Sequence, residues 1–189
     1  NMFGYSCTGP EHCTRVSCLW PKRCPHFVGT PARYAALLEM ARREPGIRHL
    51  FVTTGLRLEL AMESPDFIRA VATHHVSGRL KVAPEHCVPT VLGAMRKPAG
   101  EAFEPFLTAF ARYGKGLGKR QEVLPYLMAA HPGCSLANML ELALTLKRLH
   151  VVAEQCQIFT PTPGTASTAM YCTGLDPATL TPVFVERDP

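Results

Sequence analysis

Long hydrophobic runs are missing from this sequence of 189 residues, and nothing in it approaches the roughly 20 apolar residues of a transmembrane helix. No signal peptide heads it either. We therefore expect a cytoplasmic protein without a membrane partner. The composition, 47% hydrophobic and 19% charged, is typical of a soluble globular domain, and the length suits one domain with a core of useful size.

Several motifs that would identify an enzyme class are also absent. The sequence has no Gly-x-Ser-x-Gly, no His-Glu-x-x-His and no paired-carboxylate motif, so it matches no common hydrolase signature. The glycine-rich residues 114–120 do not form a phosphate-binding loop. Such a loop needs four residues between its glycines, a Ser or Thr after the Lys, and a strand before it. We predict a basic turn there.

The positive charge is modest and dispersed. A net charge of +5 allows weak affinity for anions, but the basic residues do not cluster as they do on a dedicated nucleic-acid surface. Nucleic acid therefore stays open as a partner without support from the sequence. The alternative function that this leaves is a mildly basic binding module, with RNA as its ligand, that holds a metal on four cysteines and has no enzymatic activity.

Cysteine, in contrast, is abundant, with eight in all and four of them in the first 24 residues. Cys7, Cys13, Cys18 and Cys24 follow the spacing C-x5-C-x4-C-x5-C, which lacks the Cys-x-x-Cys of common zinc fingers. Four thiolates bind zinc or an iron–sulfur cluster, and both stay open. Two disulfides or free buried thiols are the alternative. We assign residues 1–29 to a cysteine-rich, metal-binding insertion.

Residues 30–164 alternate between predicted helices and strands. Strands are expected at 49–54, 80–83, 122–130 and 151–159, with a helix between each pair, which is the βαβ rhythm of a parallel sheet. The predicted fold is α/β, a partial TIM-like (βα) barrel of about four parallel strands with flanking helices. No strand precedes the first helix and no methionine starts the chain, so we expect an excised piece of a longer protein.

Ser64-Pro65 is expected to cap a helix that ends near His75, and a helix at roughly 101–113 is expected to carry Phe103, Phe106, Leu107 and Phe110 on one face. Two further local predictions concern the C-terminal half. Ser135 is expected to cap a helix, and the residues expected to face inward are Leu136, Met139, Leu140, Ala143 and Leu146. Residues 165–189 are assigned to a turn-rich C-terminal extension with one helical turn at 177–180.

Polar residues follow each predicted strand. Because parallel strands end at one rim, the rim would gather Glu85, His86, His131 and Thr160, with further polar groups at Thr53, Thr54, Arg57 and Thr162. This is the composition of a polar ligand site. The alternatives are that Glu85 caps the next helix, and that His86 and His131 are packed, hydrogen-bonded histidines.

Three of these strand ends together resemble the radical S-adenosylmethionine (SAM) enzymes. The matching segments are Pro84-Glu85-His86 with Val91, Leu92, Met95 and Lys97 at set offsets, then 130–135 and 159–165. The chain is most similar to the YgiQ-like, uncharacterised branch: it shares the Asn1-Met2-Phe3-Gly4 start, the cysteine run, and the segments 81–86, 131–134 and 159–163. It departs from the superfamily where His86 replaces a Ser and Cys134 replaces a Glu.

The resemblance implies an enzyme that reduces SAM by one electron at a [4Fe–4S] cluster, with an external one-electron reductant as partner and an unknown substrate. It places Glu85 and His86 near the ribose or methionine part of SAM, and His131, Phe159 and Thr160 near the adenine. The cluster-binding C-x3-C-x2-C would lie upstream, so this fragment alone would be inactive. The four N-terminal cysteines would then hold a separate zinc ion or a second iron–sulfur cluster.

Overall fold

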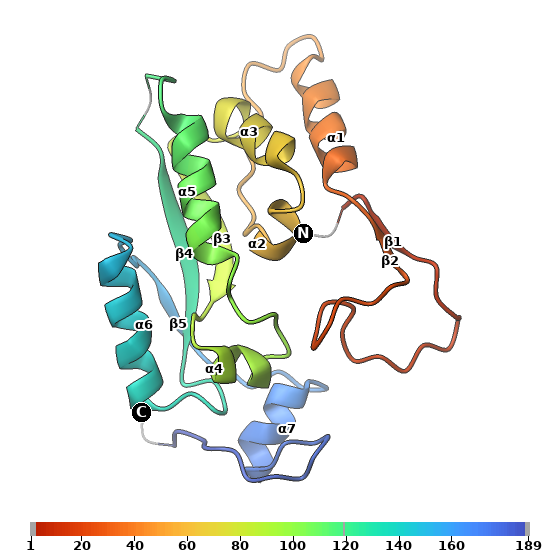
Figure 1. The fold of residues 1–189 in the computed structure, drawn as a ribbon, viewed down its shortest axis with the longest axis vertical. Coiled ribbons are helices and arrows are strands. Elements are labelled where there is room, and N and C mark those ends of the chain that lie inside the picture. Colours follow the sequence, from red (N-terminus) through yellow and green to blue (C-terminus); the bar gives the residue numbers. More distant parts are fainter. Residues whose placement is uncertain (1–2, 119, 188–189) are drawn as a thin grey trace.

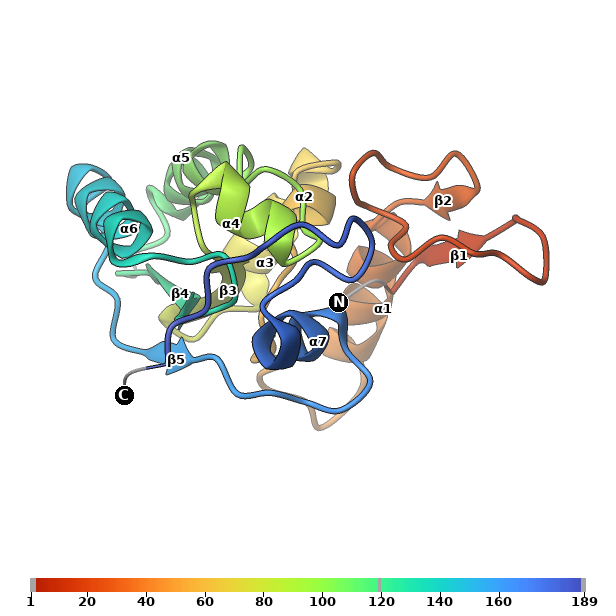
Figure 2. The same ribbon diagram turned by 90° about the horizontal axis from the view of Figure 1, so that it is seen from below.

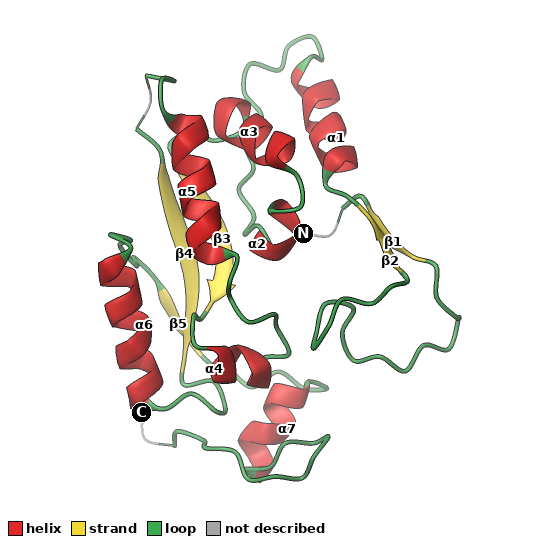
Figure 3. Ribbon diagram, viewed as in Figure 1, coloured by secondary structure: helices red, strands yellow, loops and turns green. Residues whose placement is uncertain are grey.

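A computed structural model describes residues 3–118 and 120–187 of the chain. A three-stranded parallel sheet lies at its centre, flanked by helices, with a small hairpin at one end (Figures 1 and 3). The strands are β1 Tyr5–Cys7, β2 Phe27–Gly29, β3 Arg79–Glu85, β4 Glu122–Ala129 and β5 Cys156–Ile158. The helices are α1 Ala32–Arg42, α2 Leu58–Ala61, α3 Pro65–His74, α4 Pro89–Ala94, α5 Phe103–Gly114, α6 Leu136–Arg148 and α7 Ala166–Thr173. Every described helix is too short or too polar to span a bilayer.

The parallel sheet has the order β3-β4-β5, in chain sequence. Residue pairs run in register from Arg79 and Glu122 to Val82 and Pro125, after which a shift brings Glu85 opposite Leu127. Helices α5 and α6 connect the strands on one face of the sheet, as Figure 2 shows from below. The predicted α/β class is confirmed, and the sheet does not close into a barrel within the described residues.

Three of the four predicted parallel strands form, and the prediction of a strand at 49–54 was wrong. This segment is extended, but its Val52 N–H donates to the carbonyl of His75 rather than to a strand. Only at Leu56 does the chain reach β3, where one parallel bridge joins Leu56 to Val82. Of its three consecutive apolar residues, Val52 is buried in the core and Phe51 is exposed, so the segment is packed without pairing as a strand.

Helix starts follow their predicted caps. The Ser64 hydroxyl accepts from the Phe67 N–H at 3.2 Å, with Pro65 in the first turn, as Ser64-Pro65 indicates. Ser135 caps α6 through a reciprocal arrangement with Asn138, in which each side chain accepts from the other residue's backbone N–H. These local rules need no tertiary information, which is why the sequence reveals them.

The inward face of α6 was predicted less well. Met139 and Leu146 pack against the core, but Leu136 is 83% exposed and Leu140 is 60% exposed. Leu142, which was not among the predicted residues, is buried instead. A helix rich in leucine on several sides leaves the choice of its buried face to the sheet beneath it.

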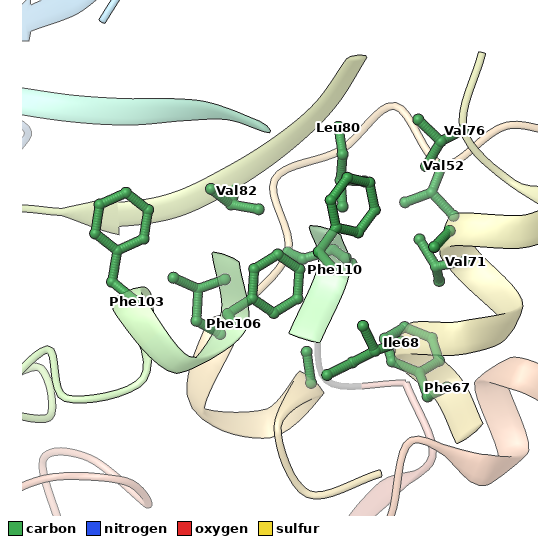
Figure 4. Close-up of a cluster of buried hydrophobic side chains, with 14 of the residues drawn as sticks. Val52, Phe67, Ile68, Val71, Val76, Leu80, Val82, Phe103, Phe106 and Phe110 are labelled. Carbon is green, nitrogen blue, oxygen red and sulfur yellow. The ribbon is translucent and has the colours of Figure 1, made fainter. Parts of the chain in front are cut away.

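The main core lies between the sheet and helices α3 and α5 (Figure 4). Phe103, Phe106 and Phe110 line one side of α5, spaced as the sequence pattern predicts, and all three are buried. They meet Leu80 and Val82 on β3, which are fully buried. This layer therefore fixes β3, the strand that carries Glu85, against the helices.

One arginine, Arg96 in the loop after α4, contacts both the cysteine-rich segment and the C-terminal extension. The Arg96 guanidinium lies 4.7 Å from the ring centroid of Trp20 in the cysteine-rich segment. It also binds both carboxylate oxygens of Asp176, at 2.7 and 2.9 Å. A hydrogen bond from the Leu180 N–H to the Asp176 carbonyl closes a turn at the predicted position. Helix α7, which precedes it, was not predicted.

Replacing Phe106 with Ala should lower the free energy of unfolding of the chain by about 3–5 kcal/mol, because it opens a cavity in this core. Urea unfolding followed by circular dichroism measures the change. The control is Phe184→Ala at a half-exposed ring, expected to cost less than about 1 kcal/mol. Equal losses in the two variants would contradict this view of the core.

Candidate functional site at the strand ends

Strands β3 and β4 share one backbone feature at the point where they end. Glu85 and Ala130, the last residues before the turns, adopt left-handed conformations with φ of 63° and 55°. Such values cost a non-glycine residue about 1–2 kcal/mol and cluster at functional sites. The residue after each turn, His86 or His131, is buried beneath the rim. Two strained turns side by side therefore place two imidazoles together.

Glu85 is held by a lysine rather than by a helix terminus. The Lys97 ammonium lies 3.2 Å from a Glu85 carboxylate oxygen and donates to the Ala83 carbonyl at 2.7 Å. Lys97 is almost fully buried, whereas the Glu85 side chain is 27% exposed, so the carboxylate end of the pair still reaches water. The alternative role of Glu85 as a cap is not realised, since α4 has no side-chain cap. The lysine fixes the carboxylate at the end of β3.

His86 is neutral and buried. Its Nδ1 accepts from the Val88 N–H at 3.0 Å, so Nε2 carries the proton, and it faces the Cys134 sulfur at 3.7 Å. Burial, with a smaller effect of His131, lowers the pKa of His86 to about 4. Burial also raises the pKa of the Cys134 thiol, so this sulfur is not an activated nucleophile.

His131 joins β4 to helix α7. Its Nδ1–H donates to the Pro132 carbonyl at 2.7 Å, and its Nε2 accepts from the Ser167 hydroxyl at 2.8 Å. Burial lowers the pKa of His131, although the Pro132 carbonyl and the charge of Glu85 act in the opposite direction. The ring meets Phe159 edge-on, with centroids 5.1 Å apart.

Of the five residues that the resemblance implies as ligand contacts, four thus come together from three strand ends: Glu85, His86, His131 and Phe159. Phe159 is placed by its N–H, which donates to the Ala129 carbonyl at 2.9 Å and extends the pairing of β5 with β4. The fifth, Thr160, is exposed, and its hydroxyl turns back to the Ile158 carbonyl at 3.4 Å.

Other residues of the site were not assigned a role from the sequence. Ser167 and Tyr171 come from α7. The centroids of the Tyr171 and Phe159 rings lie 5.8 Å apart. A signal for this helix was present, because Thr165 caps it through the Thr168 N–H, as a Thr after a glycine turn can. Lys97 was noted only for its offset from Glu85.

A cavity of about 560 Å³ opens beside the end of β3. Ala83, Pro84 and Lys97 contribute to its wall, together with Leu58 and Phe103 from the flanking helices. A larger hollow of about 860 Å³ lies at the opposite, amino-terminal end of β4. Ligands of parallel α/β proteins bind at the carboxyl ends of strands, which favours the smaller cavity. Glu85, His86, His131 and Phe159 do not line it, and it reaches the site only through Lys97 and the end of β3.

The predicted metal ligands are not gathered at one point. Cys7 and Cys13 are exposed, while Cys24 is buried and donates its N–H to the Cys18 carbonyl at 2.7 Å. Within residues 3–118 and 120–187, no three His, Cys, Asp or Glu side chains form a metal-binding group. All eight cysteines are free thiols, so the disulfide alternative is not realised in this structure.

Most ion pairs of the described chain use arginine, which reduces the free positive charge available to a polyanion. Pairs with a nearby carboxylate are formed by Arg23, Arg42, Arg43, Arg57, Arg69, Arg79, Arg96, Arg120 and Arg148.

The site and sheet together describe an α/β unit with a polar rim at its strand ends. No protein-family model matches the chain. It is 49% identical over 190 residues, 99% of its length, to a UPF0313 protein of Geobacter sulfurreducens. It is also similar to UPF0313 proteins of Methanosarcina acetivorans, at 41% over all of the chain, and Clostridium perfringens, at 44% over 93% of it. The chain spans 31%, 26% and 27% of these relatives' lengths, less than a third in each case.

The buried, neutral His86 should make stability depend on pH. Its pKa in the folded state, about 4, lies below the ordinary 6.5, so the unfolded chain binds more protons between these values. The contribution is complete above about pH 6.5 and is lost as the pH falls through 4. Urea unfolding at intervals from pH 7 to 4 should show a shallower decline for His86→Gln than for the unmodified chain. His26→Gln, at an exposed ring, is the control. A decline equally steep in His86→Gln would contradict this assignment.

Proposed function

We propose that the chain is part of a cytoplasmic radical SAM enzyme of the YgiQ-like branch, which uses a [4Fe–4S] cluster to cleave SAM reductively. The observation that supports it best is the meeting of Glu85, His86, His131 and Phe159 at the ends of three parallel strands. The resemblance to radical SAM enzymes depends on these same positions. At Phe159 the residue type matches as well. The names of the similar proteins state no activity. The reaction of the whole protein is therefore proposed, and its substrate is left unnamed.

The residues present fit the SAM part of this proposal. The Glu85 carboxylate, oriented by Lys97, is an acceptor for ribose hydroxyls or for the methionine ammonium group. The face of Phe159 suits the adenine ring, and buried, neutral imidazoles supply hydrogen-bonding groups without an added charge. Thr160 lies next to Phe159 in sequence and could contact the adenine only from the exposed side of the rim.

The residues do not fit the cluster. A [4Fe–4S] centre needs three or four cysteine thiolates around one point, and no group of three forms in the described part of the chain. We therefore place the cluster ligands outside this chain, with the upstream segments that a longer protein would supply. Within the site described here, the residues of this chain bind and orient SAM.

We propose that the N-terminal cysteines bind a separate metal, zinc or iron–sulfur. Cys18 and Cys24 already lie close through their backbone contact, and both pack against the small core that includes Leu19 and Phe27. Residues 8–26 contain no helix or strand, so Cys13 can approach this pair without breaking a regular element. Metal binding would then require this segment to close around Cys7 and Cys13 as well.

Two tests use the full-length protein, one of activity and one of SAM binding. Purified without oxygen and reconstituted with iron and sulfide, the protein should produce 5′-deoxyadenosine from SAM when dithionite is added. Phe159→Ala should weaken SAM binding about 5- to 150-fold, because stacking of a base on an aromatic ring contributes about 1–3 kcal/mol. Glu85→Gln should weaken it in the same direction. Calorimetric titration measures the affinity, with Phe184→Ala as the control. No 5′-deoxyadenosine from the unmodified protein would refute the proposed activity.

Metal analysis tests the cysteine proposal on the 189-residue chain itself. Anaerobically purified chain should contain zinc or iron in a fixed ratio, and Cys13→Ala should lower the content at least severalfold, because one of four ligands is lost. Cys172→Ala removes another exposed cysteine and is the matched control. An equal metal content in all three proteins would refute a site on Cys7, Cys13, Cys18 and Cys24.

A further inference from the structure

Helix α6 is apolar on two sides. Leu142 and Leu146 face the core, while Leu136, Leu140 and Leu144 are 83%, 60% and 57% exposed. The three exposed leucines are spaced by four residues, so they form one ridge along the helix. A helix that is apolar on opposite sides is normally buried on both of them. The exposed ridge therefore calls for a partner.

The sheet next to α6 is uncovered as well. The parallel register pairs Leu127 with Cys156 and Ala129 with Ile158, so Ile158 lies on the same face of the sheet as the buried Leu127. Yet Ile158 is 67% exposed. Among the described strands, β5 pairs with β4 alone, and Figure 2 shows α6 at the end of the helical layer on that side. The ridge and Ile158 are thus both exposed on the same side of the sheet, and we name the surface that they span the α6–β5 slot.

The course of the chain explains why the slot is open. In a parallel α/β sheet the helix after a strand crosses back over the same face, in a right-handed connection, to reach the next strand. After β5 the chain instead turns to the rim and forms α7, which Ser167 attaches to His131. The place that a crossover helix would occupy is therefore left empty by the described residues.

We propose that the α6–β5 slot is the docking site of an amphipathic helix from the same polypeptide, supplied by the part of the longer protein beyond this region. The similar proteins leave ample chain for it, because this region covers less than a third of their length. One helix laid across the slot would cover the leucine ridge and Ile158 together. The inference does not depend on SAM binding.

A photo-crosslinking amino acid, benzoylphenylalanine, placed at Leu140 of the full-length protein tests the proposal. We expect crosslinks within one polypeptide, at a yield independent of protein concentration, and peptide mass spectrometry should map them to a segment outside residues 1–189. The same group at Arg112, on the exposed side of α5, is the control and should give no such product. Crosslinks between copies, which indicate self-association, or the absence of any crosslink specific to Leu140, would overturn the proposal.

A double substitution, Leu140→Glu with Leu144→Glu, gives a second measurement. Both side chains are solvent-exposed in the 189-residue chain, so its denaturation midpoint should stay unchanged. The midpoint of the full-length protein should fall, because two charges would enter a covered apolar contact. A fall of the same size in both proteins, or in neither, would overturn the proposed contact.

Discussion

The parallel pairing of β3 with β4 is the constraint on which the site depends. Because the two strands run in the same direction, their last residues meet at one rim, and the left-handed turns at Glu85 and Ala130 lie side by side. Each turn costs free energy and is retained by burial of the histidine that follows it. The Phe103–Phe110 layer of α5 supports this arrangement by packing β3 against the helices. Loss of that packing would disturb the rim without touching a rim residue.

The rim combines common side chains, and their arrangement, rather than any one of them, would determine which ligand it binds. An ionised pair, two neutral imidazoles and an aromatic face meet within three strand ends, in surroundings that lower the pKa of both histidines. Such a surface favours a ligand with separate polar and aromatic parts over a simple anion. Helix α7 contributes Ser167 and Tyr171 to this rim, from a segment that was predicted to be a turn-rich extension.

Features set by residues close together in the sequence were predicted, whereas features set by contacts between distant segments were not. Ser64, Ser135 and the α5 phenylalanines were recognised because caps and helical spacing are local properties of the sequence. The strand at 49–54 failed because its apolar run is short and its partner, β3, is chosen by tertiary packing. The ion pair of Glu85 with Lys97 and the contact of His131 with Ser167 were missed for the same reason, since each joins residues whose proximity only the fold creates. The exposure of Leu140 depends on what lies beside α6, which a helical pattern alone does not state.

Arg96 connects three parts of the molecule that are far apart in the sequence. The guanidinium stacks on Trp20, binds Asp176, and precedes in sequence the lysine that holds Glu85. Arg96 is therefore the point at which the cysteine-rich segment, the C-terminal extension and the rim are joined. Any movement of the cysteine-rich segment at Trp20 acts on the residue next to the lysine that holds the carboxylate at the end of β3.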